Sequence, residues 1–170
     1  MNIEQARFNM IEQQIRPWDV LNLGVLELLA VVKREDFTPL AYKALAFVDT
    51  EVPLAEGERM LAPRVEARML QDLQVQRHER VLEVGAGSGF MAALLGHRAQ
   101  SVITLEVKPA LARIRRMTPG WAPNVAMSRI LGARTVTCRA TGSSADLTLA
   151  RAGPGWIRTD SVVSANRSWH

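Results

Sequence analysis

Apolar side chains recur at intervals of three and four residues through much of the N-terminal part, a spacing typical of amphipathic helices. Residues 2–16 should form the first helix, with Asn2 as its N-terminal cap and its end before Pro17. Residues 20–33 should form the second, which Asp19 would cap. The expected apolar faces of these two helices comprise Phe8, Ile11, Ile15, Leu21, Val25, Leu28, Leu29 and Val32.

Two more helices are expected, over 40–46 and over 63–73, and Pro63 suits the first turn of the longer one. The segment between them lacks helical spacing, so 51–54 should be extended and 56–58 should form a turn. The expected apolar face of the longer helix comprises Val65, Met69, Leu70 and Leu73.

The pattern then changes to a short apolar run over 81–84, which leads into three glycines in the spacing Gly-x-Gly-x-Gly. Glycine has no Cβ atom, so a ligand can approach such a turn closely, and the helix expected after it presents free N–H groups. Phe90 stands where a dinucleotide-binding turn has its third glycine. Glu83 precedes the turn, and its carboxylate suits a cationic or hydroxyl-rich ligand better than a pyrophosphate, which it would repel.

A second strand is indicated by the β-branched and apolar residues over 101–105, which end in Glu106. Strand, glycine turn, helix and strand together form one βαβ unit. Glu106 follows Gly89 by 17 residues, a position from which an acid can accept hydrogen bonds from the two ribose hydroxyls of a nucleoside. The alternative is an ordinary glycine-rich turn in some other α/β protein.

The glycine turn and the acid after it resemble motif I and the following acidic residue of class I S-adenosylmethionine-dependent methyltransferases. The resemblance implies S-adenosyl-L-methionine as the cofactor. It also implies an α/β fold, a Rossmann-like doubly wound sheet of the class I methyltransferase type with an N-terminal helical cap, here with an incomplete sheet. The cap would cover 1–57 and the S-adenosylmethionine-binding domain 58–170. The cofactor-binding residues implied are Glu83, Gly85, Ala86, Gly87, Ser88, Gly89 and Glu106.

Over residues 1–108 the chain is similar to one methyltransferase family, the protein-L-isoaspartate O-methyltransferases. Besides the N-terminal helices, the motifs that carry the similarity are 34–37, 51–54 with Gly57, 60–63, 81–90 and Glu106. The similarity implies transfer of a methyl group to the free carboxylate of isoaspartyl residues in damaged proteins, a protein-repair reaction. Isoaspartyl-containing proteins or peptides would then be the partners.

One departure from the family pattern concerns the segment before Pro63. The family has Thr-Ile-Ser there, and its serine is tied to catalysis, whereas this chain has Leu61 at that position. A leucine side chain neither donates nor accepts a hydrogen bond. We therefore assign no catalytic residue, and a methyltransferase-like protein that binds a ligand or partner without catalysis is an alternative.

The second departure is the composition of 109–170, which has nine arginines, no lysine and two acids, a net charge of +7 against −3 for 1–108. The family's Gly-Asp-Gly turn is missing, the helix after Pro109 should break early, and 145–150 is a weak candidate for a fourth strand. Arginine without lysine suggests a shifted reading frame of a GC-rich gene beginning near 109–115, which would leave this segment atypical or disordered. A basic tail that binds nucleic acid is the competing interpretation, but its arginines form neither a helical face nor a dense run.

The remaining composition fits a globular protein, with 48% hydrophobic and 22% charged residues in a chain of 170. There is no apolar run of membrane-spanning length and no export signal, and the single cysteine, Cys138, agrees with a reducing compartment. We expect a cytoplasmic protein, a monomer, with no metal site, no membrane association and no nucleic-acid partner.

Overall fold

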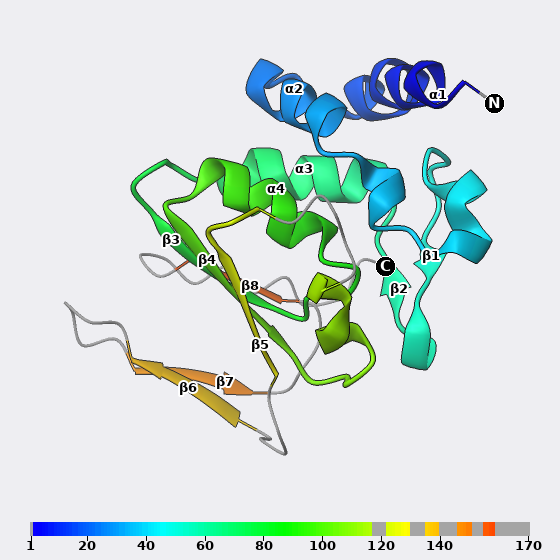
Figure 1. The fold of residues 1–170 in the computed structure, drawn as a ribbon. Helices are drawn as coiled ribbons and strands as arrows, with labels where there is room; N and C mark the ends of the chain where they lie inside the picture. The colour runs from blue at the N-terminus through cyan, green and yellow to red at the C-terminus, as the bar shows by residue number, and fades with distance from the viewer. Residues whose placement is uncertain (1, 117–121, 130–134, 140–145, 151–154, 159–170) are drawn as a thin grey trace.

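A mainly parallel β-sheet with helices stacked over one of its faces forms the centre of the structure (Figure 1). The computed structural model describes residues 2–116, 122–129, 135–139, 146–150 and 155–158. Its α-helices are α1 (Ile3–Met10), α2 (Leu23–Val31), α3 (Pro63–Leu73) and α4 (Phe90–Arg98), and the helix predicted over 40–46 is a 3-10 helix, Leu40–Leu45. Its strands are β1 (Val52–Pro53), β2 (Arg59–Met60), β3 (Arg80–Val84), β4 (Ser101–Glu106), β5 (Val125–Arg129), β6 (Thr135–Arg139), β7 (Asp146–Ala150) and β8 (Gly155–Arg158).

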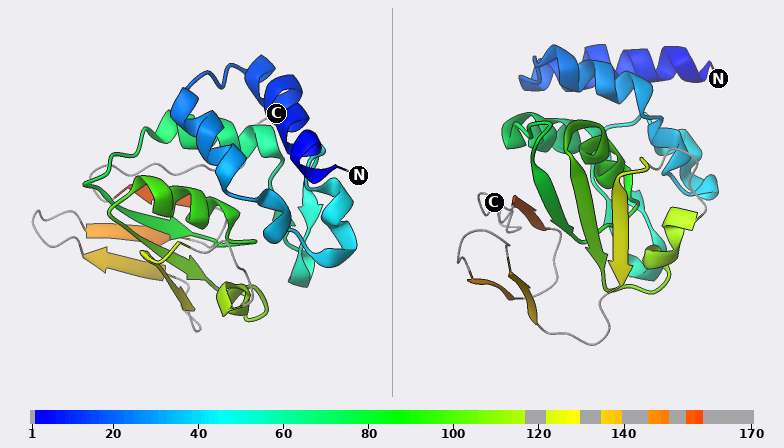
Figure 2. Two further views of the ribbon diagram at one scale, coloured as in Figure 1. Left: turned by 45° about the horizontal axis from the view of Figure 1, so that its top comes forward. Right: turned by 60° about the vertical axis from the view of Figure 1, so that its left-hand side comes forward.

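The helices form two tiers above the sheet, as the views in Figures 1 and 2 show. Helices α3 and α4 lie directly on the sheet, and α1 and α2 lie over them. One cluster of buried apolar side chains runs through both tiers and includes Ile15, Leu29, Leu70, Leu94 and Val102. The predicted α/β fold class is therefore confirmed, whereas the division at 57/58 stays a prediction. No helix among the described residues has the length and apolar character needed to cross a membrane.

The first helix and its neighbour begin and end close to the predicted positions, with two corrections. Phe8 is 58% exposed because α1 continues into a wider π-helical turn, Ile11–Ile15, which changes the angular phase between Phe8 and the buried Ile15. Leu21 is 64% exposed because α2 begins only at Leu23. Asn22, and not Asp19, caps α2, since its side chain accepts a hydrogen bond from the Val25 N–H.

The predicted apolar face of α3 is rotated by about one residue in the structure. Val65 is 37% exposed, while Glu66 and Ala67 are buried beside Leu70. The reason is an ion pair: Glu66 binds the buried Arg34, so a charged side chain takes an interior position that the pattern gave to an apolar one.

The main sheet has the strand order β5-β4-β3-β8. Strands β3, β4 and β5 are parallel, with Val81 opposite Val102 and Val102 opposite Val125. These valines are buried under the helices, and Ile103, which alternates with Val102 along β4, is 49% exposed. Within the described ranges the helices thus cover one face of the sheet only.

The segment that leads into β5 packs closely against the end of α4. The side-chain amide of Asn124 donates hydrogen bonds to the carbonyls of Gly96 and Ala99, at 2.8 and 3.1 Å. A Cβ atom added to Gly96 would lie 2.6 Å from Cγ2 of Val125 and 2.7 Å from Cβ of Ala122. Only a glycine fits at position 96, so α4 and the segment leading into β5 are in direct contact there.

The prediction for a fourth sheet strand at 145–150 is wrong in its placement. Residues Asp146–Ala150 do form a strand, β7, but it pairs antiparallel with β6 in a separate two-stranded sheet. An antiparallel pair needs only a short connection, whereas a parallel strand in the main sheet would need a crossover. The place beside β3 belongs to β8, which runs antiparallel to it.

Candidate functional site

The glycine turn between β3 and α4 has the backbone conformation that the sequence predicts. Gly85, Gly87 and Gly89 have φ angles of 92°, 53° and 81°, which side-chain-bearing residues rarely adopt. The Gly85 N–H donates to the Leu105 carbonyl at 2.8 Å, which ties the turn to the neighbouring strand. A Cβ atom added to Gly87 would lie 3.7 Å from Cδ1 of Leu54, so that side chain borders the turn.

The two residues between the glycines are buried and orient their backbone for the helix that follows. Ala86 accepts a hydrogen bond from the Gly89 N–H at 2.7 Å, and the Ser88 hydroxyl accepts one from the Phe90 N–H at 3.3 Å. Helix α4 begins at Phe90, with Gly89 as its N-terminal cap. Its dipole and its first N–H groups face the turn, an arrangement that suits a partly negative or hydroxyl-rich ligand.

Glu106 lies at the turn, as its position after the second strand predicts. Its Oε2 atom accepts a hydrogen bond from the Gly87 N–H at 3.0 Å, and its Oε1 atom accepts one from the Lys108 N–H at 2.8 Å. A carboxylate offers about four lone-pair directions, so about two acceptor positions remain for hydroxyl groups of a ligand. The parallel neighbours β3 and β4 bring this acid and the glycines together, because their C-terminal ends share one edge of the sheet.

Glu83 lies in β3 and is buried between the sheet and the helices, opposite Thr104 of β4. Burial raises the pKa of its carboxyl well above the usual range, the Thr104 side chain opposes this shift, and the nearby Glu106 and Glu66 raise the pKa further. Its Oε2 atom has no hydrogen-bond partner within the described part of the chain. A buried carboxyl oxygen without a partner two residues from the turn is consistent with a ligand that supplies one.

A short hairpin and the segment after β4 lie beside the turn and are joined to each other. The carboxylate of Glu56 accepts a hydrogen bond from the Ala110 N–H at 2.9 Å, and Lys108 forms an ion pair with Glu58 at 3.7 Å. The hairpin made of β1 and β2 carries Leu54 over Gly87. The family motif at 51–57 is therefore part of the surroundings of the glycine turn.

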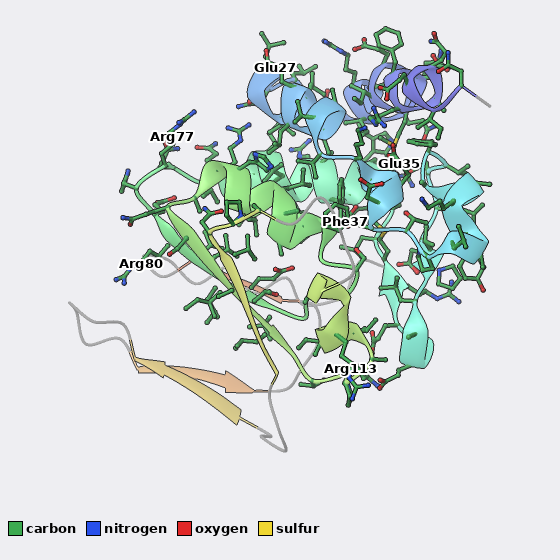
Figure 3. All side chains as sticks on the ribbon, in the orientation of Figure 1. Glu27, Glu35, Phe37, Arg77, Arg80 and Arg113 are labelled. Carbon is green, nitrogen blue, oxygen red and sulfur yellow. The ribbon has the colours of Figure 1, made fainter. Side chains whose placement is uncertain are left out.

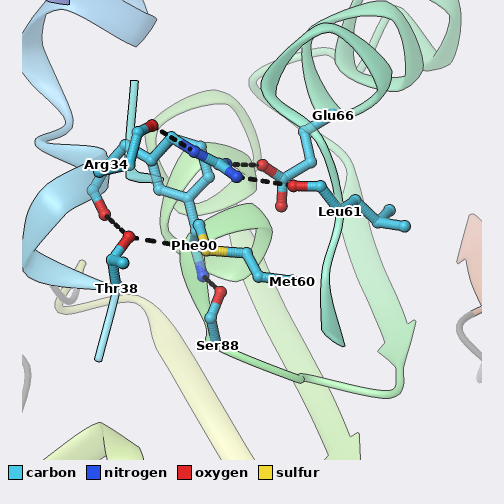
Figure 4. A network of polar contacts seen from close by, with 8 residues as sticks. Arg34, Thr38, Met60, Leu61, Glu66, Ser88 and Phe90 are labelled. Carbon is cyan, nitrogen blue, oxygen red and sulfur yellow. Dashed lines mark hydrogen bonds and ion pairs between the residues drawn. The ribbon is translucent and has the colours of Figure 1, made fainter. Parts of the chain in front are cut away.

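A buried cluster around Arg34 connects these parts, and its members come from four segments of the chain (Figure 4). The side chain of Arg34 is 1% exposed. It forms an ion pair with Glu66, and its Nη2 atom donates to the Leu61 carbonyl at 2.6 Å. Its Cζ atom lies 5.2 Å from the centre of the Phe90 ring, within range of a cation–π contact. Burial raises the pKa of Glu66 to about 7 despite the opposing effect of Arg34.

This cluster was not predicted from the sequence, which treated 34–37 only as a motif. One signal could have revealed it: Glu66 interrupts the apolar face of α3. Phe37 adds to the cluster, because its ring lies 5.5 Å from that of Phe90. Figure 3 shows Phe37 and Glu35 between the upper helices and α4.

Two histidines, His78 and His97, lie away from the glycine turn. Both line a groove at the N-terminal end of β3, together with Arg77 and Arg98. The glycine turn follows the C-terminal end of the same strand. In Figure 3 Arg77 lies at the upper left of the molecule and Arg113, from the segment after β4, at the bottom. These histidines are therefore not part of the site around the glycine turn.

Comparisons with known proteins agree with this geometry. The family model of protein-L-isoaspartate(D-aspartate) O-methyltransferase matches residues 5–118, ten residues beyond the predicted extent. A protein-L-isoaspartate O-methyltransferase 2 of Anaeromyxobacter sp. (strain Fw109-5) is 40% identical over 108 residues, 64% of this chain and 44% of that one. The Aeropyrum pernix protein-L-isoaspartate O-methyltransferase is 41% identical over 115 residues, 66% and 44% of the two chains. The chain thus spans about half the length of the curated relatives that it matches.

Solved structures support the fold. A protein-L-isoaspartate O-methyltransferase of Plasmodium falciparum, in complex with S-adenosyl-L-homocysteine, superimposes with a TM-score of 0.54 at 20% identity, over 72% of this chain and 62% of that one. A second protein-L-isoaspartate O-methyltransferase superimposes with a TM-score of 0.58 at 19% identity, over 72% and 41%. At these identities the likeness concerns the fold alone.

Proposed function

The chain belongs to the protein-L-isoaspartate(D-aspartate) O-methyltransferase family, and we propose that it binds S-adenosyl-L-methionine and methylates isoaspartyl carboxylates in damaged proteins. The observation that carries the proposal is the carboxylate of Glu106 beside Gly87, within a turn of three glycines at positive φ. An acceptor for ribose hydroxyls and a backbone without Cβ atoms are what a nucleoside sulfonium needs. The residues present therefore fit the cofactor.

The proposed methyl transfer requires no acid–base catalysis by the protein. When bound, S-adenosylmethionine supplies a methyl group on a positively charged sulfur, ready for transfer to an oxygen nucleophile. An isoaspartyl carboxylate is already ionised at neutral pH and needs no general base. The task of this chain's residues is to align that carboxylate with the cofactor and to exclude water. Glu106 would hold the ribose, and Glu83, Gly85, Ala86, Gly87, Ser88 and Gly89 would shape the pocket.

A second candidate function is ligand binding without methyl transfer, and Leu61 favours it. This residue occupies the position of the family serine, and its apolar side chain offers the acceptor no hydrogen bond. Its carbonyl is held by Arg34, so the backbone is fixed while the side-chain chemistry is lost.

Two measurements separate these functions. Isothermal titration with S-adenosylhomocysteine tests the cofactor site, and transfer of a labelled methyl group to an isoaspartyl peptide tests the reaction, with the aspartyl peptide of the same sequence as control. Binding with methyl transfer supports the proposal, and binding alone supports the second candidate. Leu61→Ser should then raise the transfer rate by about tenfold or more, since it restores one hydrogen bond of about 1.4 kcal/mol in the transition state. Absence of binding would refute both.

We also propose a later start for the shifted reading frame in the C-terminal segment. The family match through 118 and the close packing of Asn124 and Val125 against α4 favour a change of reading frame after Val125, later than 109–115. Reading the coding DNA beyond this codon tests it, because a shifted frame should restore the Gly-Asp-Gly turn. We also propose a cytoplasmic monomer that acts on proteins containing isoaspartate.

A further inference from the structure

We propose that Arg34 is a positioning residue that fixes the methyl-acceptor side of the site relative to the cofactor side. The proposal rests on the proposed function, since it assigns those two sides. It concerns a residue of the N-terminal cap that lies outside the glycine turn and does not belong to the predicted cofactor set. Arg34 acts through its neighbours and is not itself placed in contact with either substrate.

The contacts of Arg34 divide between the two sides of the site. On the acceptor side it holds the carbonyl of Leu61, the position of the family serine, and the carboxylate of Glu66 one helical turn into α3. On the cofactor side its guanidinium lies over the ring of Phe90, the first residue of α4. The Phe90 N–H is in turn bound by Ser88 inside the glycine turn. Three successive contacts therefore connect Leu61 to the turn, through Arg34 and Phe90.

The geometry requires a guanidinium rather than any cation. The Nε atom of Arg34 donates to the Ala46 carbonyl at 3.0 Å, while Nη1 and Nη2 serve Glu66 and Leu61. The flat face of the group remains free to stack on Phe90. A lysine would keep the charge, but its ammonium is a point donor without a planar fork. It could not serve three diverging acceptors and an aromatic ring together.

A purely structural role is the competing explanation, and the chain offers a matched control for it. Arg7 is also a buried arginine of the cap, and it forms an ion pair with the buried Glu35. Within the described part of the chain its side chain binds Glu4 and Glu35, which belong neither to the Leu61 segment nor to the glycine turn. Loss of either arginine should lower global stability, whereas loss of Arg34 alone should loosen the site.

The test compares Arg34→Lys with Arg7→Lys in the full chain, each at the same interval below its own midpoint of thermal unfolding. Hydrogen exchange of the amides over 86–91, measured without ligand, reports the order of the glycine turn. We expect Arg34→Lys to raise this exchange at least tenfold and to weaken S-adenosylhomocysteine binding at least fivefold, and Arg7→Lys to change both less than twofold. Phe90→Leu keeps the ion pair between Arg34 and Glu66 and removes the ring that Arg34 and Phe37 contact, and it should give the same local increase in exchange.

The inference is overturned if Arg34→Lys and Phe90→Leu leave the exchange of the turn within twofold of the unsubstituted chain. It is also overturned if Arg7→Lys produces the same local increase, because the effect would then follow from any buried arginine of the cap. Should the unsubstituted chain fail to bind S-adenosylhomocysteine, the proposed function fails, and the exchange measurement still decides whether Arg34 orders the turn.

Discussion

Replacing Gly96 with alanine tests whether the chain beyond 108 packs as the structure describes. Gly96 lies in α4, and an added Cβ atom would meet Val125 Cγ2 at 2.6 Å, Ala122 Cβ at 2.7 Å and Asn124 Oδ1 at 3.2 Å. Carbon atoms in ordinary contact lie about 3.5–4.0 Å apart. The substitution therefore requires that α4 and the segment leading into β5 separate.

Whether Gly96→Ala destabilises or stabilises the protein depends on whether residues 122–125 pack against α4. Overpacking a close contact costs about 1–3 kcal/mol, and two contacts below 3 Å put this case in the upper part of that range. Alanine in a helix interior recovers about 1 kcal/mol relative to glycine. The net expectation is a loss of about 1–2 kcal/mol in the free energy of unfolding, or about 3–6 °C in Tm. If 122–125 did not contact α4, the same substitution would stabilise the protein by about 0.5–1 kcal/mol.

Urea denaturation followed by circular dichroism measures the change, provided that the m-values agree. Gly24→Ala in α2 is the matched control, because its new Cβ would meet only the far end of the Arg98 side chain and the helix cap Asn22, at 3.0 Å and beyond. That variant should be neutral or slightly stabilising. In a Val125→Ala background the penalty of Gly96→Ala should shrink by about 0.5 kcal/mol or more, as expected for residues in contact.

A Gly96→Ala variant that is as stable as the unsubstituted chain, or more so, would refute the reasoning. It would mean that Asn124 and Val125 do not lie against α4. The change of reading frame would then be placed near 109–115 again, as the sequence alone suggests. An equal penalty for Gly24→Ala would show that the loss has another cause.

Three further predictions concern the glycine turn and the acids beside it. Because the folded protein raises the pKa of Glu83, its proton is bound more tightly in the folded than in the unfolded chain, so its contribution to stability is lost as pH rises above about 4.5. We therefore expect the free energy of unfolding of Glu83→Gln, relative to that of the unsubstituted chain, to increase from pH 5 to pH 8. Urea denaturation at each pH measures this difference, and a difference that does not change with pH would contradict the prediction. Gly87→Ala should lower the free energy of unfolding by about 1–2 kcal/mol, the cost of a left-handed conformation, and weaken S-adenosylhomocysteine binding in a calorimetric titration; unchanged affinity would place the ligand elsewhere. Glu106→Gln should weaken that binding about fivefold, since a charge-assisted hydrogen bond exceeds a neutral one by about 1 kcal/mol, and an effect below twofold would argue against its role at the ribose.

Much of the candidate site could be predicted because its signals are local. A run of three spaced glycines between an apolar strand and a helix gives the turn, and Glu106 follows from the length of one βαβ unit. What could not be predicted is the phase of the apolar faces. Phe8 and Val65 fit a helical period but lie at the surface, because a π-helical turn and a buried ion pair shift the faces that pack.

The sequence by itself determined the positions of the helices, the glycine turn and the acid that follows β4, because each depends on residues close together in the chain. Only the tertiary structure decided which charged residues are buried together, since Arg34, Glu66 and Phe90 are far apart in the sequence and meet where cap, α3 and α4 converge. The tertiary structure also decided which strand pairs with β3: the partner is β8, which runs antiparallel to it, while β7 pairs with β6. Strand pairing joins segments that are distant in the chain, and it depends on packing that no local pattern encodes.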